Sequence, residues 1–124
     1  MAAVLREIII DCTDPRAVAA FWAQVLGWSV QESGDVLWMS ESGEPFPDLL
    51  LVFVAVPEPK SAKNRVHLDV NPVDREQDDE VRRLLGLGAR HADVGQTGEE
   101  SWVVLADPEG NEFCLLATRV PPVA

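Results

Sequence analysis

The stretch Asp107–Ala117, with the sequence DPEGNEFCLLA, decides the fold that this chain is expected to adopt. Its first four residues put Asp, Pro and Gly at the first, second and fourth positions of a type I turn. The residues that follow alternate between two faces of a strand, and one face carries Glu112, Cys114 and Leu116. The stretch therefore predicts a tight turn that leads into the last strand of a sheet, with polar side chains on one face.

Length and composition indicate a single globular domain with an acidic surface. Of the 124 residues, 47% are hydrophobic and 25% are charged, as in ordinary globular domains. The 10 Lys and Arg residues stand against 21 Asp and Glu residues, which gives a net charge of −11. Such a surface repels phosphate backbones, so we expect no nucleic-acid partner. It attracts cationic small molecules, although a role in solubility alone also accounts for it.

The cysteines and the N-terminal segment indicate the cellular compartment in which the protein is expected. Cys12 and Cys114 form neither a disulfide framework nor a Cys-x-x-Cys metal motif. Arg6, Glu7 and Asp11 interrupt the apolar run near the N-terminus, so the run predicts neither a signal peptide nor a membrane span. We therefore expect a cytoplasmic protein with reduced thiols and no membrane association.

A strand, a helix and further strands follow one another twice along the chain. In the first half we expect strands and a helix at 4–11, 14–27 (helix), 28–32, 36–40 and 49–56. The segment 57–63 has the composition of a linker. In the second half we expect elements at 65–71, about 74–87 (helix), 89–94, 101–106 and after the turn at Asp107.

The two halves also align with each other. A shift of sixty positions sets Glu7 against His67 and Ile9 against Asp69, on strands that occupy the same place in each half. An internal duplication of this kind predicts a pseudo-symmetric fold. Neither half could bury its sheet alone, so we expect them to pack together in one α+β domain.

Three motifs together resemble the vicinal oxygen chelate (VOC) superfamily, and more narrowly its glyoxalase-like and bacterial bleomycin-resistance-like branch. The motifs are IIIDCTDPRAVAAFWAQVLGW, KNRVHLDV and WVVLADPEGNEFCLL, and the resemblance covers residues 4–118. It implies two βαβββ modules whose strands form one cupped mixed sheet, usually in a homodimer. Residues 1–124 are then a single domain, with module one at about 3–56, a linker at 57–63 and module two at about 64–118.

The resemblance also implies where a metal ion would bind. Family metalloenzymes hold a divalent ion at the base of the cup with a His or Glu from the first and last strands of each module. Glu7 and His67 match two of these positions, whereas the last strand has Cys114 in place of Glu, and the fourth strand offers only the apolar Leu51 or Phe53. The implied cofactor is at most a divalent metal ion held by Glu7 and His67 with an incomplete ligand set.

Each candidate residue has a structural interpretation beside the functional one. Glu7 and His67 form a weak metal site, an acid–base pair in which Glu7 orients His67, or a hydrogen-bonded core pair. Cys114 is a soft ligand or reactive thiol, or else inert packing. The other expected ligand-binding side chains either line the cup or serve turns and the core; they are Asp11, Trp38, Phe53, Asp69, Trp102 and Glu112.

We therefore predict a small-molecule-binding protein with a pocket in the cup. In its enzymatic form, Glu7 or His67 would move a proton next to a carbonyl in metal-independent chemistry of the lyase or isomerase type. The alternative is a non-catalytic binder that sequesters a cationic antibiotic or metabolite, as the family's resistance members do. A third hypothesis is a cup filled by its own side chains. The expected partners are a small molecule and a second copy of the chain.

Overall fold

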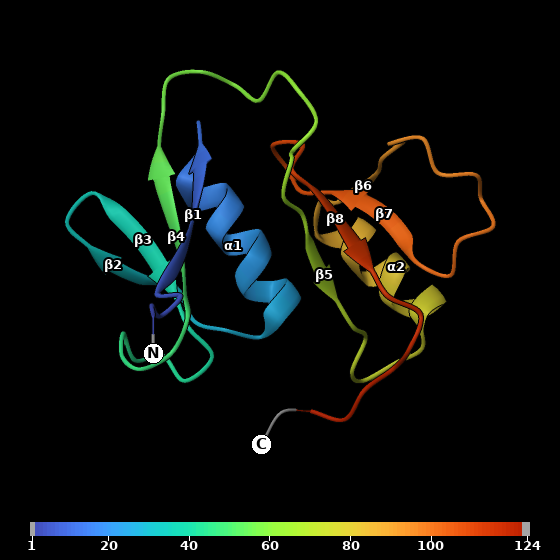
Figure 1. Cartoon of the computed structure of the whole chain (residues 1–124), viewed down its shortest axis with the longest axis horizontal. Coiled ribbons are helices and arrows are strands. Elements are labelled where there is room, and N and C mark those ends of the chain that lie inside the picture. Colours follow the sequence, from blue (N-terminus) through green and yellow to red (C-terminus); the bar gives the residue numbers. More distant parts are fainter. Residues whose placement is uncertain (1, 123–124) are drawn as a thin grey trace. The chain divides into compact units, whose positions relative to one another are not determined.

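The computed structural model describes residues 2–122 and divides into two compact units, Met1–Pro59 and Lys60–Ala124. Each unit runs strand, helix, strand, strand, strand, which confirms the expected pair of βαβββ modules (Figure 1). The first unit consists of β1 (Glu7–Cys12), α1 (Pro15–Leu26), β2 (Gln31–Ser33), β3 (Val36–Met39) and β4 (Leu50–Ala55). The second consists of β5 (Leu68–Val70), α2 (Gln77–Leu87), β6 (Arg90–His91), β7 (Val103–Ala106) and β8 (Glu112–Leu115).

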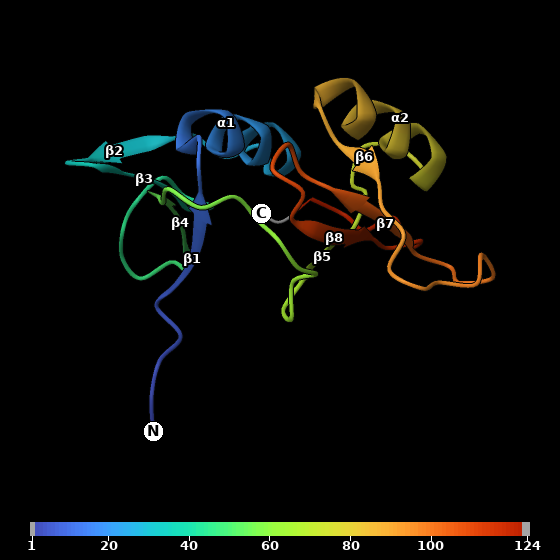
Figure 2. The ribbon, with the colours of Figure 1, turned by 90° about the horizontal axis from the view of Figure 1, so that it is seen from above.

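The two sheets have the same topology. Their strand orders are β1-β4-β3-β2 and β5-β8-β7-β6. In each sheet the first strand of the module pairs in parallel with the last, and the other pairs are antiparallel. Each helix lies over one side of its own sheet (Figure 2). No helix in the described part of the chain has the length and apolar character needed to cross a bilayer.

Helix α1 begins and ends where its sequence signals predicted. The side chain of Asp14 accepts a hydrogen bond from the Ala17 N–H at 3.3 Å, and Pro15 occupies the first helical position. Gly27 ends the helix in the left-handed region, with φ of 71°, and its N–H donates to the Ala23 carbonyl at 2.8 Å. One face of the helix packs into the core through Val18, Ala19, Phe21 and Trp22.

Helix α2 begins later than predicted, at Gln77 rather than directly after Asp74. The intervening backbone is engaged elsewhere: the Pro72 carbonyl accepts from the Val120 N–H at 3.0 Å, and the Val73 carbonyl accepts from Arg119 Nε at 2.9 Å. These contacts with the C-terminal segment hold the backbone in a non-helical path. The prediction was wrong here because they join residues far apart in the sequence.

Strand β6 is also shorter than predicted, because only Arg90–His91 of the expected strand 89–94 is paired in that form. The side chain of Gln96 accounts for this difference. Its Nε2 donates to the Ala92 carbonyl and its Oε1 accepts from the Val94 N–H, both at 2.8 Å. A side-chain amide thus replaces a neighbouring strand and turns the segment into a loop.

The turn at Asp107 fixes the start of β8. The Gly110 N–H donates to the Asp107 carbonyl at 2.9 Å, which closes the predicted turn. Asp107 is fully buried, and its carboxylate accepts from the N–H groups of Glu109 and Asn111 at 2.9 and 3.0 Å. Gly110 has φ of 91°, a conformation that favours glycine. The turn therefore sets the register of the strand that carries Cys114.

Candidate functional site

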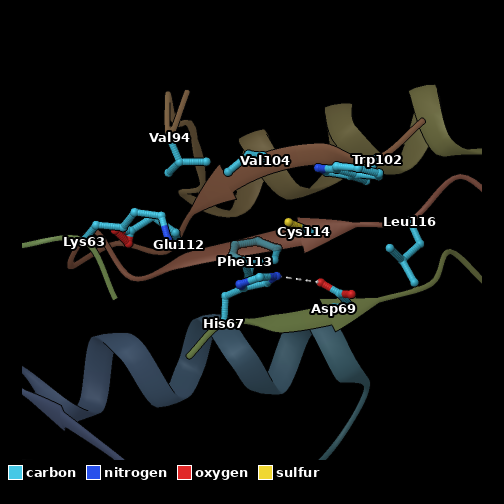
Figure 3. A pocket seen from close by; sticks show the side chains of 10 residues that line it. All are labelled: Lys63, His67, Asp69, Val94, Trp102, Val104, Glu112, Phe113, Cys114 and Leu116. Carbon is cyan, nitrogen blue, oxygen red and sulfur yellow. Dashed lines mark ion pairs between the residues drawn. The ribbon is translucent and has the colours of Figure 1, made fainter. Parts of the chain in front are cut away.

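A pocket of about 260 Å³ lies in the second unit, close to the lower end of the range of about 300–1,000 Å³ in which small molecules bind. Strands β5, β7 and β8 supply half of its lining residues, and the residues next to these strands, a loop and the segment before β5 supply the rest (Figure 3). The lining residues are Lys63, His67, Asp69, Val94, Trp102, Val104, Glu112, Phe113, Cys114 and Leu116.

Strand register explains why these side chains share a pocket. Asp69 of β5 pairs with Cys114 of β8, which in turn pairs with Val104 of β7. Paired residues in neighbouring strands point to the same face of a sheet, and so do residues two positions apart on one strand. Phe113 and Leu115 flank Cys114 along β8, and both are fully buried. The pocket therefore occupies the face of the sheet that the alternation in β8 predicted to be polar.

Three potential ligand side chains meet on this face. His67 Nε2 lies 3.3 Å from Asp69 Oδ1, and the donor atoms of His67, Asp69 and Cys114 lie within 4.8 Å of one another. Figure 3 shows the imidazole and the carboxylate side by side, with the sulfur of Cys114 on the neighbouring strand. The side chains of His67 and Asp69 are each 49% exposed, whereas Cys114 is buried. The cluster thus combines two accessible polar groups with one buried thiol.

The surroundings of Cys114 keep its thiol protonated. Burial raises the pKa of Cys114. The negative charge of Asp69 and its hydrogen bond with the thiol raise that pKa further, while the charge of Lys63 acts in the opposite direction. A thiol with a raised pKa is a weak nucleophile, because the thiolate is the reactive form. The interpretation of Cys114 as an activated thiol has no support from this environment.

Glu112 carries a charge that the protein itself compensates. Its Oε1 accepts from Lys60 Nζ at 2.7 Å, and its two carboxylate oxygens accept from the Asn64 N–H at 3.2 and 3.3 Å. Burial alone would raise the pKa of Glu112, but the hydrogen bonds from Lys60 and Asn64 outweigh it and hold that pKa below its ordinary value. Glu112 therefore anchors the segment before β5 and adds little negative charge to the pocket.

The expected site residues of the first unit do not line this pocket. Glu7 and Asp11 are exposed on β1, and Trp38 is half-buried on β3. Phe53 is fully buried and pairs with Ile10 and Leu37, so it belongs to the core rather than to an open wall. The expected pairing of Glu7 with His67 joins residues of different units and stays a prediction.

Five lining residues were not among the predicted site residues. Leu116 directly follows β8 and continues the alternation that includes Cys114, and Val104 pairs with Cys114, so alternation carried a signal for both. Phe113 also borders the pocket, although alternation assigns it to the other face of β8 from Glu112 and Cys114. Lys63 lies in the linker segment, which has no periodicity, and Val94 lies in the loop that replaces the end of the expected strand 89–94.

The cluster on β5 and β8 has the chemistry of a metal site. An imidazole nitrogen, a carboxylate oxygen and a cysteine thiolate are the three kinds of ligand that zinc accepts, with a fourth position left for water or substrate. A bound zinc ion would itself deprotonate the Cys114 thiol. Ligand atoms around a tetrahedral zinc ion lie about 3–4 Å apart, given metal–ligand distances of about 2.0–2.3 Å. The spacing of the three donor atoms, within 4.8 Å, fits such an ion after a small adjustment of side chains.

Residues 7–116 match the family model described as a glyoxalase-like domain. This match spans most of the chain, which therefore belongs to the glyoxalase-like domain family. Solved structures of the glyoxalase, bleomycin-resistance and VOC group share its fold, which confirms the resemblance inferred from the three sequence motifs. No protein of curated function matches the chain in sequence.

Three solved structures illustrate the shared fold. The fosfomycin resistance protein FosX from Listeria monocytogenes, in complex with Mn(II) and a dihydroxypropylphosphonic acid, has 14% identity and a TM-score of 0.69, over 97% of this chain and 93% of that one. A glyoxalase/bleomycin resistance protein/dioxygenase family enzyme from Burkholderia phytofirmans has 21% identity and a TM-score of 0.59, over 91% and 97%. The oxidase ChaP-H2 has 18% identity and a TM-score of 0.62, over 98% of both chains. At these identities the likeness concerns the fold alone.

Proposed function

We propose that this chain binds a small organic molecule in the pocket of its second unit and that His67 exchanges a proton with that molecule. The observation that carries the proposal is the His67–Asp69–Cys114 cluster against a largely apolar wall. Pockets of this kind, with a few convergent polar groups, are the usual sites of small-molecule binding. The pocket also lies within the glyoxalase-like domain, and the structural neighbours include a fosfomycin resistance protein solved in complex with a dihydroxypropylphosphonic acid.

The chemistry that suits this cluster is proton transfer next to a carbonyl, in a reaction of the lyase or isomerase type. Asp69 lies against Nε2 of His67 at 3.3 Å and orients the ring, which leaves Nδ1 as the atom that takes a proton from carbon and returns it. Cys114 remains a thiol and supplies a hydrogen-bond donor to Asp69. A positioned acid or base of this kind accelerates a reaction by about 10²–10⁴-fold.

The same three side chains would hold a divalent metal ion as cofactor. Bound there, the ion would polarise a carbonyl oxygen of the ligand as a Lewis acid. The soft sulfur donor favours zinc over magnesium or manganese, which prefer oxygen ligands. Elemental analysis of protein purified without chelator should then find zinc, with much less in Cys114→Ser and Asp69→Asn. A metal content in both variants as high as in the unmodified chain would contradict this assignment.

Sequestration of a ligand without chemistry is the second candidate function. The observation that favours it is the environment of Cys114: a buried, protonated thiol is no nucleophile, so catalysis in this pocket would rest on His67. In this case His67 and Asp69 would form hydrogen bonds to the ligand and would not transfer a proton. Deuterium exchange at carbon in a bound carbonyl compound separates the two candidates, since only the catalytic one accelerates that exchange.

A variant that fills the pocket tests the proposal of binding. Thermal unfolding is measured with a panel of organic acids, amines, carbonyl compounds and sugars, each at high concentration. A ligand at one hundred times its Kd stabilises the protein by about 2.7 kcal/mol. Leu116 borders the pocket, so Leu116→Trp should abolish the stabilisation that at least one compound gives to the unmodified chain.

The matched control introduces the same side chain outside the pocket. Leu85 lies on α2, is 36% exposed and does not line the pocket. Leu85→Trp should therefore keep the ligand response. The proposal fails if no compound stabilises the unmodified chain, or if Leu116→Trp responds as strongly as Leu85→Trp.

A further inference from the structure

We infer that the ligand of this pocket is a planar organic anion, whose ring lies on Trp102 and whose carboxylate or similar group lies at Lys63. This inference rests on the proposed binding function and specifies the class of ligand. It also reverses the expectation of a cationic ligand, which followed from the net charge of −11. Charge near the ligand decides selectivity, whereas net charge acts at longer range and is screened by salt.

The carboxylates of the pocket are already occupied. Glu112 is paired with Lys60 at 2.7 Å and accepts the Asn64 N–H. Asp69 lies against His67 at 3.3 Å and accepts the thiol hydrogen of Cys114. A cationic ligand would therefore have to displace groups that the protein itself supplies. Lys60 thus compensates the charge of Glu112, and the imidazole of His67 and the thiol of Cys114 occupy the carboxylate oxygens of Asp69.

Lys63 is the lysine that lines the pocket, and within the described residues no carboxylate forms an ion pair with it. Its Nζ donates to the Asn64 carbonyl at 3.3 Å. An ammonium group has three donor hydrogens, so two remain for a ligand. The polar group that this pocket can still satisfy is therefore an anion.

Trp102 supplies a flat apolar surface at the other end of the pocket. Its side chain is 45% exposed, although Trp is a residue that proteins generally bury, and it directly precedes β7. In the view of Figure 3 the indole is seen edge-on, with Lys63 at the opposite end of the lining residues. No other aromatic ring stacks on it in the part of the chain that the structure describes. Val104 and Leu116 continue the apolar wall, so an aromatic ring would be enclosed there.

The indole face alone would also accept a cation, because its quadrupole attracts positive charge. The positive charge of Lys63 decides whether the ligand is a cation or an anion, since it repels a cation and attracts an anion in the same pocket. The test therefore compares ligands of one shape and different charge. Naphthoate, naphthamide and naphthylmethylammonium share a ring and carry negative, neutral and positive groups.

Binding of these three compounds is measured by titration calorimetry at neutral pH with the full chain. Naphthoate should bind at least about tenfold more tightly than naphthamide, and naphthylmethylammonium should bind most weakly. Lys63→Gln should bring the affinity for naphthoate down to that for naphthamide. Trp102→Ala should weaken all three by about 5- to 100-fold, the range of base-stacking losses on alanine substitution, and should keep their order.

Arg82→Gln is the matched control, because it removes one positive charge from an exposed side chain of α2 in the same unit. It should leave the order and the affinities unchanged. The inference is overturned if naphthylmethylammonium binds best, if Lys63→Gln keeps the preference for naphthoate, or if none of the three binds while other compounds stabilise the chain. In those cases the binding function stands. If naphthoate still binds equally well to Leu116→Trp, both the inference and the proposed function fail.

Discussion

Glu80 on α2 is buried although it is charged, and its carboxylate faces two guanidinium groups. Oε1 lies 2.7 Å from Arg83 Nε and 3.2 Å from Arg75, and Oε2 accepts from Arg83 at 2.7 Å. Burial alone would raise the pKa of Glu80, but the hydrogen bonds and charges of Arg83 and Arg75 outweigh it and hold that pKa below its ordinary value. A group whose pKa is lowered on folding stabilises the folded state only while it is ionised.

Glu80→Gln should therefore lower the free energy of unfolding at pH 7 by about 1.5–3 kcal/mol, because it weakens charge-assisted hydrogen bonds at a buried position. The contribution of Glu80 is present above the unfolded pKa of about 4.5 and is lost as the pH falls through the lower folded value. The difference between Glu80→Gln and the unmodified chain should thus shrink below about pH 4. Urea unfolding at pH 7 and pH 3.5 measures it.

Asp79 provides the control on the same helix. It forms an exposed ion pair with Arg82, three residues further along α2, and exposed pairs contribute only about 0.2–1 kcal/mol. Asp79→Asn should therefore change the unfolding free energy by less than about 1 kcal/mol at either pH. If Glu80→Gln and Asp79→Asn lowered the unfolding free energy equally, the burial of Glu80 would not strengthen its ion pairs.

Single residues of the candidate site were predictable where an alternating strand carries them. His67, Asp69 and Cys114 come together because β5 and β8 pair in the register that alternation implies. Lys63 was not predictable, because contacts between Asn64 and β8, 48 positions apart, hold its segment. The charge balance of the pocket was hidden for the same reason, because the pairing of Glu112 with Lys60, 52 positions away, is not apparent from the sequence.

At the scale of elements, the two helices differ in how they begin. Asp14 caps α1 through its side chain, whereas Glu76 at the start of α2 makes no side-chain hydrogen bond of that kind. A polar N-cap satisfies backbone N–H groups that the first turn leaves without partners. Asp14→Ala should therefore cost about 0.5–2 kcal/mol in the free energy of unfolding.

Glu76→Ala is the corresponding change on α2, where no cap is lost. It removes only an exposed contact with Arg119 at 3.4 Å, so it should cost less than about 1 kcal/mol. Chemical denaturation of both variants measures the two effects under the same conditions. A loss in Glu76→Ala as large as that in Asp14→Ala would contradict the capping argument.

The sequence predicted elements well where a local signal sets their ends. Asp14-Pro15 and Gly27 bounded α1, and the apolar run 49–56 contains β4 at Leu50–Ala55. Helix α2 and strand β6 differed because distant or side-chain contacts override the local pattern: Arg119 engages the carbonyl of Val73, and Gln96 replaces a strand neighbour. Local propensity cannot anticipate such partners, since each depends on the folded arrangement of the chain.

At the scale of the whole molecule, each sheet has one edge formed by the first strand of its module. Strand β1 has β4 as its neighbour on one side, and within the described residues its other side pairs with no strand. Ile9 on β1 is 53% exposed and Leu5 before it is 71% exposed. An unpaired edge with exposed apolar side chains is an association surface unless something covers it. These features support the expectation of a homodimer.

We therefore predict a mass in solution of twice the 13.6 kDa chain, measured by light scattering after size-exclusion chromatography. Ile9→Lys should shift the population toward the monomer, because a charge on an edge strand opposes pairing of that edge with another chain. Val30→Lys is the control: Val30 is an exposed apolar residue, at 38%, outside the strands. A monomer at every concentration would refute the homodimer, whereas a dimer that persists in Ile9→Lys would move the interface away from β1.

Because net charge −11 makes the copies repel each other, the dimer fraction should also rise with salt. That dependence separates association through apolar contacts from association through ion pairs, which salt would weaken.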